Sequence, residues 1–85
     1  MKLKDEFALK NILDTDVLLD TSGKFDGIIK LNKTMSVICQ GLKDGLDANG
    51  IAKAVCEKFD ISFDKALEDV KTAILELKKQ GLIDD

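Results

Sequence analysis

The spacing of hydrophobic residues changes near residue 32, and this change predicts two kinds of element. Before it, apolar residues form three short clusters separated by turn-forming residues, which predicts three short strands. Residues 14–16 and the glycine-containing stretch 21–27 have turn composition, so we expect an antiparallel meander, whose buried face the pattern does not define. The clusters are Phe7, Leu9, Ile12 and Leu13; Val17, Leu18 and Leu19; and Ile28, Ile29 and Leu31.

From residue 32 onward, apolar residues recur with the helical period and predict three helices. Asn32, Asp47 and Ser62 are suitable N-cap residues, and Gly45 and Gly81 are suited to end the first and third helices. The expected fold is therefore α+β: a three-stranded antiparallel sheet followed by three helices, in a single domain over residues 1–85. The helical stripes are Met35, Ile38, Cys39 and Leu42; Ile51, Ala52, Val55, Cys56 and Phe59; and Phe63, Ala66, Leu67, Val70, Ala73, Ile74 and Leu77.

Composition restricts the chemistry. The chain has 85 residues, a net charge of −3, two cysteines, no histidine and no arginine. Without histidine, Ser–His and Cys–His catalytic pairs are excluded, and we expect no catalytic residue, no metal and no cofactor. An acidic chain is poorly suited to nucleic acid. We find no apolar stretch that could span a bilayer and no signal peptide, so we expect a cytoplasmic protein that binds protein or peptide.

Three local patterns suggest other functions but lack what those functions need. Residues 14–16 and 20–22 resemble the start of calcium loops, but the fifth loop position is Leu18 or Lys24. Ser22 lies in a predicted turn, whereas the serine of a carrier protein usually starts a helix. The third predicted helix has balanced charges, which disfavours DNA binding. Cys39 and Cys56 are interpreted as buried thiols.

The third predicted strand, residues 27–31, is at an edge of the meander. Such an edge offers backbone groups to which another chain can add. Lys30 and the shortness of the strand could equally protect it, and the residues alone leave both interpretations open. Asp69 in the third helix is likewise either a solvated residue or a polar group that fixes the helix against the strands or a bound peptide.

Several residues resemble, in order and spacing, the coenzyme PQQ synthesis protein D family, the prototype of the RiPP precursor peptide recognition element. The resemblance covers residues 17–83 and is strongest from Gly27 onward. The first helix lacks the aromatic residue that the family often has near Ile38, and Gly50 stands where a helix former is usual. The subfamily is therefore not assigned. The residues that carry the resemblance are Gly27, Ile28, Ile29, Lys30, Leu31, Asn32, Thr34, Leu42, Gly45, Ile51, Val55, Asp69, Val70, Leu77, Gly81 and Leu82.

The resemblance implies a winged-helix-like fold and a non-catalytic peptide chaperone. Such domains bind the leader of a ribosomally made precursor peptide as an added strand and present it to a modifying enzyme, often a radical SAM protein. Ala66 and Ala73 would leave space for peptide side chains. The implied peptide-binding site comprises Gly27, Ile28, Ile29, Lys30, Leu31, Ala66, Asp69, Val70, Ala73 and Leu77.

We further expect a monomer or weak dimer without nucleic-acid or membrane partners. Because proline removes a strand donor, Ile29→Pro is expected to abolish leader binding. The alternative function is a winged-helix-like protein-interaction module in a regulatory complex.

Overall fold

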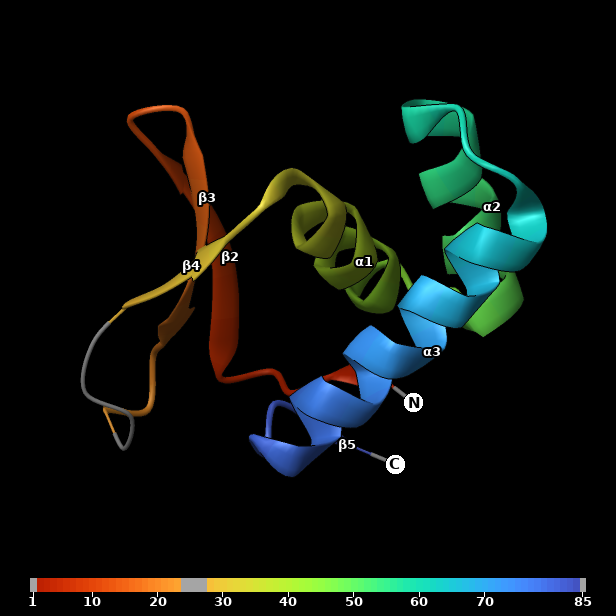
Figure 1. Ribbon diagram of the computed structural model, residues 1–85. Helices are drawn as coiled ribbons and strands as arrows, with labels where there is room; N and C mark the ends of the chain where they lie inside the picture. The colour runs from red at the N-terminus through yellow and green to blue at the C-terminus, as the bar shows by residue number, and fades with distance from the viewer. Residues whose placement is uncertain (1, 24–27, 85) are drawn as a thin grey trace.

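The computed structural model describes residues 2–23 and 28–84, and its elements follow the expected order (Figure 1). The strands are β1 (Lys2–Leu3), β2 (Phe7–Ile12), β3 (Thr15–Asp20), β4 (Ile28–Leu31) and β5 (Ile83–Asp84). The helices are α1 (Lys33–Lys43), α2 (Ala48–Phe59) and α3 (Phe63–Lys79). The predicted α+β class, with three strands followed by three helices, is confirmed as β2 to β4 and α1 to α3.

Strands β2, β3 and β4 form the predicted antiparallel meander, in that spatial order. Ile12 pairs with Thr15, so the β2–β3 turn consists of Leu13 and Asp14. Both have positive φ angles, 50° and 65°, as a type I′ turn requires. The expected turn at residues 14–16 is therefore wrong in position. Leucine seldom adopts left-handed backbone, and this preference pointed to the neighbouring aspartates instead.

Each helix begins after its predicted cap residue. The three cap side chains satisfy backbone donors that the first helical turn leaves without intrahelical partners. α3 also ends as predicted, because Gly81 has a positive φ of 78° and the N–H of Leu82 donates to the carbonyl of Leu77 at 3.0 Å. The cap oxygens accept at 2.7, 2.8 and 3.2 Å, respectively: Asn32 from Met35, Asp47 from Gly50, and Ser62 from Lys65.

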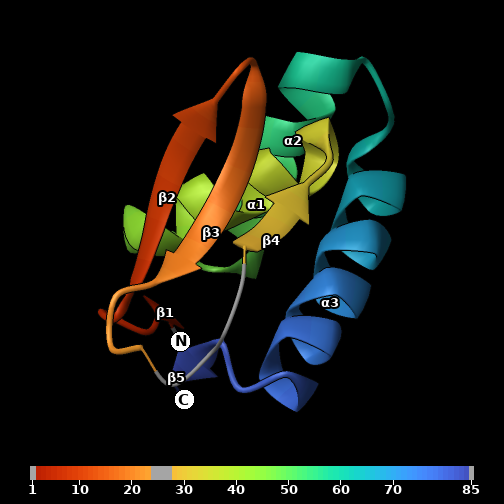
Figure 2. The same ribbon diagram turned by 90° about the vertical axis from the view of Figure 1, so that its left-hand side faces the viewer.

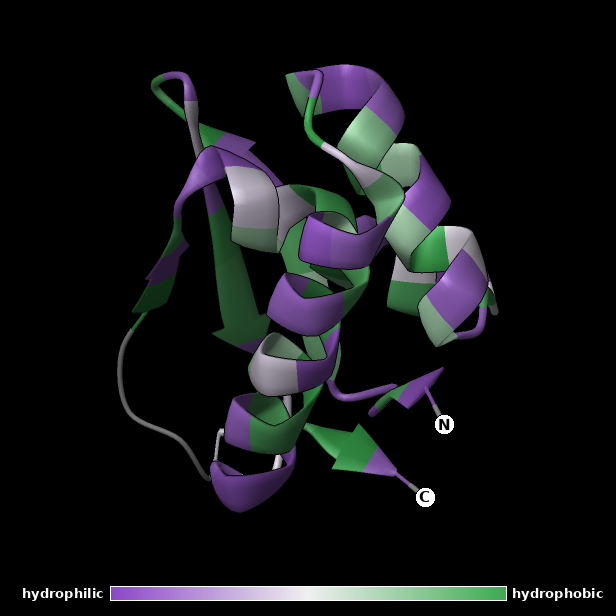
Figure 3. Cartoon of the chain, turned by 45° about the vertical axis from the view of Figure 1, so that its right-hand side comes forward, coloured by the Kyte–Doolittle hydropathy of each residue, from purple (hydrophilic) through white to green (hydrophobic). Residues whose placement is uncertain are grey.

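The core lies between the inner face of the sheet and the helices. α1 occupies the middle, with the sheet on one side and α2 and α3 on the other (Figure 1). The outward surface of α3 is mostly hydrophilic, in agreement with its single apolar stripe (Figure 3). Fully buried side chains from the sheet and all three helices meet in this core, among them Leu18, Ile38, Leu42, Ile51 and Val70.

A second, two-stranded sheet joins the two ends of the chain. Lys2 pairs with Asp84 and Leu3 pairs with Ile83, and the side chains of Leu3 and Ile83 are buried. Strands of two residues are too short to show an alternating pattern, so the sequence did not predict them. In the described part of the chain, no helix has the length and apolar character needed to cross a membrane.

Candidate functional site

β4 is an edge strand, and its open edge faces α3 (Figure 2). Its residues alternate between the two faces of the sheet. Leu31 is buried and Ile29 is half-buried on the inner face, whereas Ile28 and Lys30 are exposed on the outer face. Ile28 is 53% exposed, which is unusual for an isoleucine in a strand. Gly27 lies outside the described residues. Because β4 is the last strand in the order β2–β3–β4, the predicted edge is uncovered within the described residues.

The register shows which backbone groups of β4 point to this edge. The N–H of Thr21 donates to the carbonyl of Glu6 at 2.7 Å, and this pair continues the β2–β3 ladder. Bonded and non-bonded pairs alternate in antiparallel sheets. Counting along β3 from this pair, alternate residues bond to β2, and the residues between them bond to β4.

It follows that Ile29 and Leu31 exchange hydrogen bonds with Leu18 and Asp16, their partners in β3. Ile28 and Lys30 then direct their N–H and C=O groups away from the sheet. Among the described residues, no backbone hydrogen bond outside the ladder engages these groups. The edge therefore offers two residues with donor and acceptor groups in the arrangement that an added strand requires.

The predicted residues of α3 divide between the core and a partly open flank. Ala66, Val70 and Leu77 are buried in the core, so their side chains are not on the surface of the domain. The expected space beside Ala66 is filled by this packing, since the side chain has no exposed area. Asp69 and Ala73 are half-buried. Only these two of the five predicted α3 residues are partly accessible.

Helical geometry places Asp69 and Ala73 on the side of α3 away from α2. Lys71, Ile74 and Leu75 line a small cavity with Ala48 of α2, which identifies the α2 side of the helix. At 100° per residue, Asp69 and Ala73 lie on the opposite flank, and Glu76 and Gln80 lie beside them. The amide of Gln80 donates to Glu76 at 3.4 Å. The sequence pattern does not indicate these two polar residues, because they lie outside the apolar stripe of the helix.

Asp69 has an ion-pair partner on its own helix. Its carboxylate lies 3.2 Å from the ammonium of Lys65, in an i, i+4 pair whose side chains are 40% and 60% exposed, respectively. A pair this exposed contributes at most about 0.5 kcal/mol to stability. Asp69 can therefore exchange this partner for another donor at little cost. That Asp69 anchors a bound peptide stays a prediction.

Both cysteines lie in helices, Cys39 in α1 and Cys56 in α2. Cys39 is fully buried, and this burial raises the pKa of its thiol to about 11. Cys56 is half-buried, and its thiol donates to the carbonyl of Lys53 at 3.3 Å. Both thiols are free, so the expectation of buried thiols is correct for Cys39 and only partly so for Cys56.

Comparison with known proteins gives one family and two solved structures. The family model described as coenzyme PQQ synthesis protein D (PqqD) matches residues 16–83. TbiB1 in complex with the TbiA(beta) leader peptide superposes with a TM-score of 0.81 at 23% identity, with 100% of both chains covered. Lasso peptide synthetase B1 complexed with the leader peptide gives 0.79 at 25% identity, covering 95% of this chain and 93% of the other. No curated protein matches the sequence.

The family match includes the elements that form the open edge and the helix facing it. It begins in β3, includes β4 and all three helices, and ends in β5. It spans more than half of the chain, and the structural matches have the same fold over nearly their whole lengths. The chain therefore belongs to the coenzyme PQQ synthesis protein D (PqqD) family.

Proposed function

We propose that this domain binds the leader segment of a ribosomally made precursor peptide, which adds as a strand to the open edge of β4. One observation supports this most directly: Ile28 and Lys30 present unused backbone groups at an edge that faces α3. The two structural relatives are complexes with leader peptides. The backbone pairing would supply affinity independent of side-chain identity.

Specificity would come from the side chains of the leader that point inward. They would lie next to Ile29 on the sheet and opposite α3, whose half-buried Asp69 and Ala73 lie on the flank away from α2. An apolar side chain suits the half-buried Ile29 and Ala73, and a donor suits the Asp69 carboxylate. The buried Ala66, Val70 and Leu77 would shape this surface from beneath without contacting the peptide.

We also propose that the domain acts as a non-catalytic carrier that presents the bound precursor to a modifying enzyme. Leader binding at β4 would leave the rest of the precursor free to reach that enzyme. The nature of the enzyme, including the radical SAM type implied by the sequence, and the cytoplasmic location stay predictions.

Lys30→Pro tests strand addition more directly than Ile29→Pro, because the N–H groups of these two residues point to opposite edges of β4. Ile29→Pro would remove an N–H that bonds to β3, so it would damage the sheet as well as the binding edge. Lys30→Pro instead removes an N–H that points to the open edge. Lys30→Ala is the matched control, because it removes the same side chain and keeps the N–H.

The experiment is a titration of the ¹⁵N-labelled domain with a synthetic leader segment from a precursor peptide encoded beside this gene. We expect chemical-shift changes in residues 28–31 and along α3. Lys30→Pro should weaken binding by about tenfold or more, and Lys30→Ala by far less. Equal affinities for a folded Lys30→Pro variant and its control would contradict strand addition at β4.

A further inference from the structure

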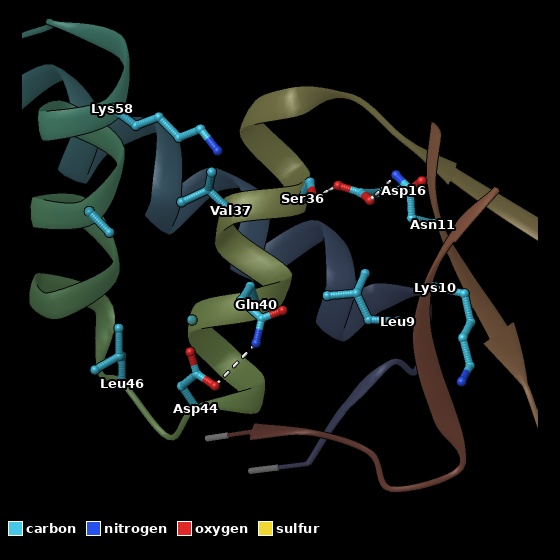
Figure 4. A pocket seen from close by; sticks show the side chains of 12 residues that line it. Leu9, Lys10, Asn11, Asp16, Ser36, Val37, Gln40, Asp44, Leu46 and Lys58 are labelled. Atoms are coloured by element: carbon cyan, nitrogen blue, oxygen red, sulfur yellow. Dashed lines mark hydrogen bonds between the residues drawn. The ribbon is translucent and has the colours of Figure 1, made fainter. Parts of the chain in front are cut away.

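A cleft lies on the side of α1 away from α3, beside the other edge of the sheet. It has a volume of about 560 Å³ and lies between the β2–β3 hairpin, α1 and α2 (Figure 4). Leu9 and Val37 provide apolar lining, and Leu46, 39% exposed, lies at the α2 end. The proposed leader site does not use any residue of this cleft.

The cleft is bordered by an open strand edge. β2 is the outer strand opposite β4. By the alternation described above, Leu9 and Asn11 direct their backbone groups away from β3. Phe7, which has the same orientation, donates its N–H outward to the carbonyl of Lys4 at 3.1 Å. The groups of Leu9 and Asn11 have no such partner among the described residues, so an extended chain could pair with them.

Four charged residues line the cleft: Lys10, Asp16, Asp44 and Lys58. Asp16 accepts hydrogen bonds from Asn11, at 2.9 Å, and from Ser36. Asp44 accepts from Gln40 at 3.1 Å. Lys58 faces the cleft from α2, and the side chain of Lys10 points away from it (Figure 4). Two carboxylates against one ammonium leave one negative charge for an incoming group to balance.

We propose that this cleft receives an extended segment of a partner protein, which pairs with β2 and carries a lysine or arginine between apolar side chains. The apolar side chains would lie against Leu9, Val37 and Leu46, and the basic one would approach Asp44. If the domain carries a leader as proposed above, this partner is the modifying enzyme. Because α1 lies between the cleft and the proposed leader site, both segments could then bind together.

A second copy of the domain is the less favourable occupant. Each copy carries a net charge of −3, so two copies repel at low ionic strength. β2 also contains Lys10, whose side chain points to the outer face and not into the cleft. Self-association therefore places no basic side chain from β2 near Asp44.

The first probe is a short synthetic peptide in which every second residue is threonine. The positions between the threonines hold leucine, lysine and leucine, in that order. With the ¹⁵N-labelled full chain, we expect amide shifts at Leu9, Asn11 and Gln40 and none along β4. A peptide with glutamate in place of lysine should bind about fivefold more weakly. Shifts confined to β4, no shifts at millimolar peptide, or equal affinities for the two peptides would overturn the inference.

Charge reversal on the protein provides an independent readout. Asp44→Lys should weaken binding of the lysine peptide and improve binding of the glutamate peptide. Glu57→Lys makes the same charge change at an exposed position of α2 that does not line the cleft, so it should change neither. Concentration-dependent shifts at these residues without peptide would instead identify a second copy as the occupant.

The leader site at β4 and the cleft beside β2 can be tested independently of each other. Lys30→Pro should lose leader binding and keep the lysine peptide, whereas Asp44→Lys should show the opposite pattern. Loss of both ligands by either folded variant would mean that they share one site, and the cleft would then be rejected as a separate binding site. Failure of leader binding alone would leave the cleft as a protein-interaction site.

Discussion

Single residues of this domain take positions that their side chains do not favour, and these positions can be tested. Leu13 occupies the first position of the β2–β3 turn with a φ of 50°, and it is 94% exposed. Left-handed backbone costs a residue with a Cβ about 1–2 kcal/mol, and asparagine tolerates it best among the non-glycine residues. An exposed leucine gains nothing from packing that would offset this cost.

We therefore expect Leu13→Asn to raise the free energy of unfolding by about 0.5–1 kcal/mol, because asparagine favours a type I′ turn. Leu13→Ala, which keeps the Cβ without the turn preference, should change it little. Urea unfolding of the three proteins measures the difference. A stabilisation by alanine as large as that by asparagine would show that exposed apolar area, and not backbone conformation, is the cause.

Asp16 predicts a pH dependence of stability. Hydrogen bonds from Asn11 and Ser36 lower the pKa of its carboxyl below the ordinary 3.8; burial opposes this, and Lys58 adds to it. The folded state thus favours the ionised form, so the stabilisation is complete above 3.8 and is lost as the pH falls through the lower folded-state pKa. The stability gap between the wild type and Asp16→Asn should therefore stay constant at neutral pH and narrow as the pH falls below 3.8.

Ser36→Ala provides the control for this effect, because it removes one of the two donors and keeps the carboxylate. Its urea midpoint should vary less with pH in the acid range than that of the wild type. Parallel pH profiles for the wild type and both variants would show that these hydrogen bonds do not stabilise the ionised carboxylate.

At the scale of elements, the helices were the most predictable part of the molecule. Their caps act through side chain and backbone within three residues, so the sequence contains the whole interaction, as at Asn32 and Ser62. The β2–β3 turn was misplaced because the pairing of Ile12 with Thr15 overrides the local preference of Leu13. β1 and β5 were missed because their stability depends on each other across the whole chain.

The candidate site was predictable in the same uneven way. The edge strand β4 followed from element order and from the resemblance to a family. The burial of Ala66 did not, because it depends on how α3 packs against the rest of the core. The cleft beside β2 had no sequence signal, since its lining comes from four elements whose residues share no periodic pattern.

The packing of α1 against α2 predicts opposite effects for one substitution at two glycines. A Cβ on Gly41 would lie 2.8 Å from Cγ1 of the fully buried Ile51, whereas on Gly50 its nearest neighbours lie at 3.4 Å. Gly41→Ala should cost about 1–3 kcal/mol. Gly50→Ala should gain about 0.5–1 kcal/mol, because alanine loses less conformational entropy in a helix.

Thermal unfolding of both variants measures this contrast. Stabilisation by both variants would mean that helix propensity dominates and that Ile51 can move away from the Cβ added at position 41. A crystal structure of the alanine variant at Gly41 would then show the displaced side chain.

At the scale of the whole molecule, the small β1–β5 sheet closes the fold. Leu3 is 4% exposed and packs in the common core with Ile83 and Leu82. Leu3→Ala should lower the free energy of unfolding by about 2–3 kcal/mol, at the lower end for a buried leucine because a chain end can relax. Lys2→Ala, one residue away and exposed, should change it by less than about 0.5 kcal/mol.

Melting temperatures provide the measurement, and for a chain of this size the Leu3→Ala loss corresponds to roughly 10 °C. Leader affinity at a temperature where both variants are folded should stay equal. A Leu3→Ala variant as stable as the wild type would show that β1 only rests on the core without contributing to it.

The pairing of Lys2 with Asp84 also determines how this domain can be joined to other proteins. Cross-strand partners lie about 5 Å apart, so connections to the two ends would leave from nearly the same point. A surface loop of a larger enzyme could therefore carry the domain as an insertion without separating the ends of that loop. The β2–β3 turn lies at the far end of the molecule from this point, and the β4 edge would remain uncovered (Figure 2).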